Sequence, residues 1–149
     1  NVKNYNNSIF DNTQKNQSFN QDVYSLTSKI EADIIYIDPP YCGTMNNYYG
    51  FYNLLDEYII SKRKAPFTNN FIDKKTILEQ FSNLFSKLEN FKYWIISYNN
   101  RSFPSKDDMY KILKKYSKNI TICEKEHLYQ ITGKYEKKKN TELLFIVEN

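Results

Sequence analysis

Glycine and histidine are scarce in this chain of 149 residues. Its three glycines, Gly43, Gly50 and Gly133, never lie within two residues of one another, so the chain contains no G-x-G loop for a phosphate or a dinucleotide. The single histidine, His127, and the two cysteines are too few for a zinc site, a Ser/His/Asp triad or a disulfide framework. We therefore expect no metal site.

Long apolar segments are also absent. No run approaches the roughly 18 residues that a membrane-spanning helix requires, and no basic start is followed by an apolar stretch, as it would be in a secretory signal. We therefore expect no membrane partner, and the low cysteine content favours a reducing cytoplasm. Because the first residue is Asn1 rather than methionine, we expect a fragment or a processed product.

The charge of the chain indicates the kind of partner, and its apolar content indicates a globular domain. Lysine and arginine total 21, and aspartate and glutamate total 17, which gives a formal net charge of +4. This mild excess favours a polyanionic partner such as a nucleic acid. A hydrophobic fraction of 40% can build a core, and the length corresponds to about one domain.

Apolar periodicity divides the chain into helices and strands. Residues 1–21 are rich in Asn, Gln and Ser without a hydrophobic period, which predicts a polar segment with a short strand at 18–19. Helical spacing of apolar side chains predicts helices at 23–30, 48–60, 74–88 and 105–116. Continuous apolar runs predict strands at 33–37, 93–98, 120–123 and 143–147. We expect the first of these strands to be buried on both faces.

The alternation of strands with helices predicts an α/β fold. We expect a mostly parallel sheet that ends in an antiparallel hairpin, with the hairpin tip in residues 133–140. In open α/β sheets, ligands bind beyond the carboxyl ends of the strands. Polar clusters at 38–41 and 97–101 follow two of the predicted strands, so we expect both clusters at one edge of the sheet.

The sharpest signal is the tetrapeptide Asp-Pro-Pro-Tyr at residues 38–41. The carboxylate of Asp38 can accept a hydrogen bond from an amino group. The carbonyl of Pro39 offers a second acceptor, and Pro39 has no backbone N–H that could compete as a donor. Pro40 stiffens the backbone that carries both acceptors. Tyr41 offers a flat face for a heterocycle, worth about 1–3 kcal/mol per stacked base. These features describe a receptor for the exocyclic amine of a base, and the alternative is a plain turn with a surface tyrosine.

With this tetrapeptide the chain resembles the amino-methyltransferases of DNA, and more narrowly the D12 class of adenine-N6 methyltransferases. The resemblance extends from about residue 19 to residue 147 and rests on the segments 20–23 (Asn-Gln-Asp-Val), 33–41, 51–56, 96–100 (Ile-Ser-Tyr-Asn-Asn) and 142–146. It implies a Rossmann-like, S-adenosylmethionine-dependent methyltransferase fold. The implied reaction transfers a methyl group from this cofactor to N6 of an adenine that is flipped out of double-stranded DNA.

The resemblance also implies roles for single residues. Asp38 and the Pro39 carbonyl would hold the amine hydrogens, Tyr41 would stack on the adenine, and Asp38 would also border the cofactor. Asp22 matches an acidic residue that meets the adenine of the cofactor, with a plain helix N-cap as its alternative. Three residues would line the substrate pocket: Ser97, Tyr98 and Asn99. For Asn99, a role in a turn is the alternative.

The chain departs from this family in what it lacks. The glycine-rich cofactor loop and the acidic residue after the strand that follows it are missing, and both precede the tetrapeptide in the D12 order. We therefore expect residues 22–149 to be the carboxyl-terminal part of a catalytic domain, inactive as a fragment. Residues 1–21 would end the segment before it.

Several alternatives stay open at this point. Asp38 favours adenine, because cytosine-N4 relatives usually carry serine there, but methylation of RNA or of cytosine N4 is an alternative within the enzymes. A non-catalytic module for DNA binding or subunit interaction, derived from a methyltransferase, is an alternative of another class. The family implies double-stranded DNA as a partner. A restriction–modification enzyme would add a restriction endonuclease or a second copy of the chain.

Overall fold

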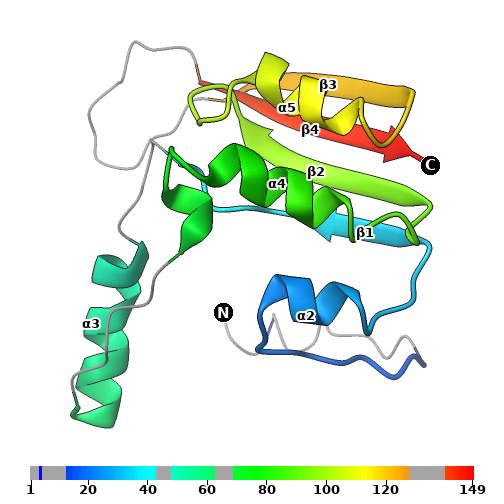
Figure 1. Ribbon diagram of the computed structural model, residues 1–149. Helices are drawn as coiled ribbons and strands as arrows, with labels where there is room; N and C mark the ends of the chain where they lie inside the picture. The colour runs from blue at the N-terminus through cyan, green and yellow to red at the C-terminus, as the bar shows by residue number, and fades with distance from the viewer. Residues whose placement is uncertain (1–3, 5–12, 43–47, 63–68, 128–139) are drawn as a thin grey trace.

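The computed structural model describes residues 4, 13–42, 48–62, 69–127 and 140–149, with the backbone alone for 48–52. These residues form a mixed sheet with helices packed against one of its faces (Figure 1). In chain order the elements are α2 (Val23–Thr27), β1 (Ile34–Ile37), α3 (Tyr48–Ile60), the 3₁₀ helix η1 (Asn70–Ile72), α4 (Ile77–Phe85), β2 (Tyr93–Asn99), α5 (Lys106–Leu113), β3 (Asn119–His127) and β4 (Asn140–Glu148).

The sheet has the strand order β1-β2-β4-β3. Among the strands of the described residues, only the pair β1–β2 is parallel, whereas β2–β4 and β3–β4 are antiparallel, so the prediction of a mostly parallel sheet is wrong. The reason is the way in which the hairpin extends the sheet beyond β2. Its second strand, β4, inserts between β2 and β3 and turns both of its contacts antiparallel. The terminal antiparallel hairpin itself is confirmed, while its predicted tip falls mostly outside the described residues.

Most predicted elements are present, with shifted ends. The helix α3 has the predicted bounds, α2, α4 and α5 are shorter than predicted, and β3 and β4 are longer. The side chain of Ser105 caps α5 by accepting a hydrogen bond from the backbone N–H of Asp108 at 3.2 Å. Residues 18–19 form no strand.

The hydrophobic core lies between the sheet and the helices α4 and α5 (Figure 1). Strand pairing places Trp94 opposite Val147 and Ile96 opposite Phe145, which aligns their side chains on one face of the sheet. The buried apolar residues of this layer are Ile77, Phe81, Leu84, Phe85, Trp94, Ile96, Tyr98, Met109, Ile112, Leu113, Leu143, Phe145 and Val147. The core thus centres on β2 and β4, the two inner strands.

The strand β1 is more open than the sequence indicates. Ile34 is 56% exposed and Tyr36 is 62% exposed, so the prediction of a strand buried on both faces is wrong. Within the described part of the chain, β1 pairs with a strand on one side only. Its alternate residues Ile34 and Tyr36 lie on the sheet face opposite the core, since their neighbour Ile35 is paired with the buried Trp94.

The helix α3 stands apart from the sheet (Figure 1). Its side chains Leu54, Leu55, Tyr58 and Ile59 are all at least 60% exposed. None of the helices in the described ranges combines the length and the apolar character that crossing a membrane requires.

Candidate active site

The two parallel strands bring the predicted polar clusters to one edge of the sheet. Ile37 and Ile96 form the last pair in the register of β1 and β2, so Asp38 and Ser97 follow side by side. In Figure 1 both strands run toward the same edge, where the chain leaves each of them. The sequence prediction that residues 38–41 and the end of β2 meet is therefore confirmed.

The tetrapeptide 38–41 exposes its carboxylate and buries its first proline. Asp38 is exposed, Pro39 is buried, and Pro40 and Tyr41 are half-buried. The hydroxyl of Tyr41 donates a hydrogen bond to Oδ1 of Asp38 at 3.1 Å, and it lies 3.2 Å from Oγ of Ser97. A solvent-accessible carboxylate thus stands on a stiff backbone with one of its two oxygens held by a neighbour.

Burial governs the ionisation of Tyr41. Desolvation is the largest cause that raises the pKa of Tyr41, to about 12. The hydrogen bond with Ser97 lowers the pKa, while the nearby carboxylates of Asp38 and Glu142 raise it. The ring packs edge-on against Tyr98, with ring centroids 6.0 Å apart. Tyr41 is therefore a neutral hydrogen-bond donor at physiological pH.

Tyr98 and Asn99 direct their polar groups into the protein rather than toward a ligand. Tyr98 is 1% exposed, and its hydroxyl donates to the backbone carbonyl of Pro104 at 2.9 Å. Burial raises the pKa of Tyr98. The side chain of Asn99 donates to Oε1 of Glu142 at 3.0 Å and accepts from the backbone N–H of Arg101 at 2.9 Å. These bonds support the turn interpretation of Asn99.

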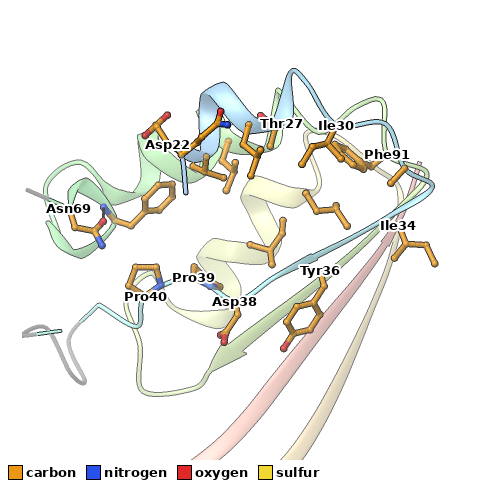
Figure 2. Close-up of a pocket in the computed structure, with 18 residues that line it drawn as sticks. Asp22, Thr27, Ile30, Ile34, Tyr36, Asp38, Pro39, Pro40, Asn69 and Phe91 are labelled. Carbon is orange, nitrogen blue, oxygen red and sulfur yellow. Dashed lines mark hydrogen bonds between the residues drawn. The ribbon is translucent and has the colours of Figure 1, made fainter. Parts of the chain in front are cut away.

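A pocket of about 590 Å³ lies between α2 and β1. Figure 2 shows Asp22 at the start of α2 on one side, and Asp38, Pro39 and Pro40 on the other. The remaining lining is largely apolar and comes from α2, β1 and the segments around Asn69 and Phe91. The volume falls within the range of about 300–1,000 Å³ that is typical of small-molecule sites.

Asp22 has the capping role that the sequence offered as an alternative. Its Oδ1 accepts a hydrogen bond from the backbone N–H of Tyr24 at 3.0 Å, which caps α2. The same residue lines the pocket opposite Asp38. A carboxylate has two oxygens, so capping leaves acceptor capacity on the second oxygen.

Sequence reasoning missed the contacts that hold the tetrapeptide from behind. The thiol of Cys42 donates to the backbone carbonyl of Ile72 at 3.1 Å, and the carbonyl of Cys42 accepts from the N–H of Phe103 at 2.8 Å. Cys42 is fully buried by these neighbours. No sequence pattern links positions 42, 72 and 103, because they become adjacent only in the folded chain.

Comparisons with known proteins identify similar sequences. The family model described as D12 class N6 adenine-specific DNA methyltransferase matches residues 1–112. The Type II methyltransferase M2.HphI of Haemophilus parahaemolyticus is 47% identical over the whole chain, which covers 44% of that protein. The modification methylase StsI of Streptococcus sanguinis is 30% identical over 94% of the chain, which covers 23% of that protein.

A third relative is also named as a Type II methyltransferase. The Type II methyltransferase M.FokI of Planomicrobium okeanokoites is 29% identical over 72% of the chain and is covered to 18% of its length. No solved structure matches the chain. The chain therefore spans less than half the length of each of these three relatives.

Proposed function

Because the chain belongs to the D12 class of N6 adenine-specific DNA methyltransferases, we propose that the full-length protein methylates N6 of adenine in double-stranded DNA. The observation that carries this proposal is the accessible carboxylate of Asp38 at the end of the parallel strand pair β1–β2. It stands next to the rigid Pro39 backbone and above Tyr41, as a receptor for an amino group requires.

In the proposed reaction, the residues of this chain position the amine and stabilise its charge. Asp38 and the carbonyl of Pro39 each accept one hydrogen of the amine, which directs the nitrogen lone pair away from them. When bound, S-adenosylmethionine would supply the electrophilic methyl group, whose bond to sulfur breaks as S-adenosylhomocysteine leaves as a neutral thioether. As the N–C bond forms, the carboxylate of Asp38 stabilises the positive charge that builds on nitrogen. The proton lost from nitrogen passes to solvent, to which Asp38 is open.

The target adenine has to leave the DNA duplex, because its amine is hydrogen-bonded inside the base stack. The proposed pocket wall is Tyr41, with Ser97 beside it at the end of β2. Tyr98 and Asn99 support this wall from within the protein, since their polar atoms bind Pro104 and Glu142. The net charge of +4 suits a DNA substrate.

The chemistry of the pocket fits the proposed cofactor. S-adenosylmethionine carries a sulfonium and an ammonium group, and Asp22 and Asp38 line the pocket from opposite sides. Apolar side chains of α2 and β1 form the wall between them. Asp22 and Asp38 are the residues proposed to hold the cofactor.

The open side of β1 supports a larger, Rossmann-like domain in the full-length protein. An edge strand with an exposed apolar face is normally paired or covered in a folded protein. M2.HphI is more than twice as long as the part that this chain matches. We place residues 22–149 in the carboxyl-terminal part of such a catalytic domain, with further strands beside β1 and a cofactor loop outside residues 22–149.

Membership in a restriction–modification system follows as part of the same proposal. Similar proteins are named as Type II methyltransferases or as modification methylases. A protein of this kind protects DNA against a partner restriction endonuclease of the same specificity. Methylation of RNA, methylation of cytosine N4 and DNA binding without catalysis are the competing outcomes of the test below.

The decisive test is transfer of a labelled methyl group to unmethylated duplex DNA by the full-length protein. Asp38→Ala is expected to lower kcat by about 10²–10³-fold or more, because it removes the acceptor for the charged amine. Asp33→Ala is the matched control, since it removes an exposed carboxylate that directly precedes the start of β1. This control is expected to retain wild-type activity.

The product identifies the reaction. Label recovered as N6-methyladenine, and lost in Asp38→Ala but not in Asp33→Ala, supports the proposal. Label recovered as N4-methylcytosine or only in RNA would reassign the substrate. DNA binding that is equal in wild type and Asp38→Ala, without any transfer, would leave the binding module as the function.

A further inference from the structure

Ser97 is joined to Asp38 through the hydroxyl of Tyr41. Oγ of Ser97 lies 3.2 Å from the Tyr41 oxygen, and the Tyr41 oxygen lies 3.1 Å from Oδ1 of Asp38. The three residues come from β2 and from the segment after β1, which are brought together by the parallel strand pair. They form a short chain of polar atoms that ends on the proposed catalytic carboxylate.

The donor in each of these two hydrogen bonds follows from the hydrogens that each group carries. A phenol has one hydrogen to donate and lone pairs that accept. An ionised carboxylate only accepts, so the hydrogen of Tyr41 is directed to Asp38. The Tyr41 oxygen is then an acceptor toward Ser97, and Ser97 is the donor. The electrostatics agree, since the bond from Ser97 lowers the pKa of Tyr41 and the bond to Asp38 raises it.

We infer that Ser97 is a positioning residue for methyl transfer, which acts through Tyr41 to fix the orientation of the Asp38 carboxylate. This inference rests on the proposed function and changes the role of Ser97 from a substrate contact to a support. Tyr41 occupies Oδ1 of Asp38 and leaves Oδ2 for the incoming amine. Because Asp38 is exposed, solvent alone would let its carboxylate rotate.

The arrangement is rigid on the Tyr41 side. The Tyr41 ring packs edge-on against Tyr98 at 6.0 Å, and Tyr98 is itself tied to the carbonyl of Pro104. The next residue, Cys42, is buried and bonded to Ile72. A tyrosine hydroxyl held in this way loses little entropy when it orients a neighbour, which is the condition for a positioning role.

The test compares kcat and KM for DNA among variants of the full-length protein. Ser97→Ala and Tyr41→Phe each remove one hydroxyl and keep the packing, so each is expected to lower kcat by about 3- to 10-fold. KM for DNA is expected to stay within about twofold, since neither hydroxyl binds the substrate in this scheme. Ser97→Thr keeps a hydroxyl on the strand and is expected to restore kcat.

The double variant distinguishes two hydrogen bonds that act in series from two contacts that act independently. Because Ser97 acts through the Tyr41 hydroxyl, Ser97→Ala combined with Tyr41→Phe is expected to be no slower than Tyr41→Phe alone. A loss equal to the product of the two single losses would overturn the inference. A rise in KM with unchanged kcat would also overturn it, because it would return Ser97 to substrate binding.

A matched control exists five residues further along the chain. Ser102 is 7% exposed, and its Oγ has no hydrogen-bond partner within the described residues. Ser102→Ala therefore removes a buried hydroxyl that takes no part in the hydrogen bonds between Ser97, Tyr41 and Asp38. Its kcat is expected to equal that of the wild type.

A spectroscopic measurement decides the inference independently of activity. With ¹³C at the tyrosine Cζ atoms, the resonance that disappears in Tyr41→Phe belongs to Tyr41. Ser97→Ala is expected to shift this resonance and Ser102→Ala to leave it in place. If the wild type methylates no DNA, the proposed function fails, and the shift alone then tests the hydrogen bond. An unchanged Tyr41 resonance in Ser97→Ala would refute the inference.

Discussion

The neighbouring strands β1 and β2 point the same way, yet they contribute differently. β2 lies between two strands, and Trp94, Ile96 and Tyr98 are each at most 1% exposed. β1 pairs on one side within the described residues and leaves Tyr36 62% exposed. The proposed reactive carboxylate, Asp38, nevertheless follows β1. The strand that presents the chemistry is therefore not the strand that stabilises the fold.

This division has a physical reason. A carboxylate that receives a ligand has to stay accessible, and an open strand end provides access at the expense of buried area. The rigidity that catalysis requires then comes from the neighbouring strand. Ser97 and Tyr98 of β2 contact Tyr41, the residue that holds Asp38.

Trp94→Ala is expected to produce the largest loss of stability, about 3–5 kcal/mol in the free energy of unfolding. The substitution removes a fully buried ring that stacks on Phe85, and it frees the carbonyls of Leu88 and Phe91, which accept from the indole N–H at 3.0 Å. Urea unfolding of the chain measures the change. A loss below about 1 kcal/mol would contradict the central role of β2.

Tyr98→Phe is expected to cost about 1–3 kcal/mol. The ring stays in the core, but the buried carbonyl of Pro104 loses the donor that lies 2.9 Å away. The matched variant is Tyr110→Phe, whose half-buried ring belongs to α5. The urea midpoint of Tyr98→Phe should fall below that of Tyr110→Phe, and equal midpoints would show that the buried bond contributes nothing.

Tyr41, which follows β1, adds a pH-dependent contribution to the stability of the folded protein. Its pKa is raised from 10.0 to about 12 in the folded protein, so folding favours the protonated phenol. The resulting stability is fully present below pH 10 and is lost as the pH rises through about 12. Urea midpoints of the wild type and Tyr41→Phe at pH 9 and at pH 11.5 test this. The advantage of the wild type should shrink at the higher pH, and a constant difference would contradict the shift.

Tyr36→Ser on β1 is expected to have the smallest effect, within about 0.5 kcal/mol in this chain, because the side chain is largely exposed. The same substitution in the full-length protein sharpens the comparison. A loss above about 1 kcal/mol there would show that further sequence covers the open face of β1. A small loss in both proteins would argue against a layer that covers this face of β1.

The local features of this protein could be predicted from its sequence. Apolar spacing located α3 at its observed bounds, and Ser105 and Asp22 cap the helices that follow them. These features depend on residues within about one helical turn of each other. The tetrapeptide 38–41 was also recognisable, since its chemistry is carried by four consecutive residues.

The arrangement of the sheet could not be predicted in the same way. The insertion of β4 between β2 and β3 depends on pairing of Trp94 with Val147, far apart in the sequence. Apolar runs of inner and edge strands look alike, so the exposure of Tyr36 had no local signal. The contacts of Cys42 with Ile72 and Phe103 were hidden for the same reason.

The sequence by itself determined most of the secondary structure, the residues Asp38 and Pro39 that are proposed to receive the amine, and the edge of the sheet where they lie. Only the tertiary structure decided which strand is exposed and which polar atoms are satisfied inside the protein. It paired the Asn99 side chain with Glu142 and Arg101 and linked Ser97 to Asp38 through Tyr41. Backbone preferences and side-chain chemistry act locally, whereas hydrogen-bond partners and burial depend on residues that only folding brings together.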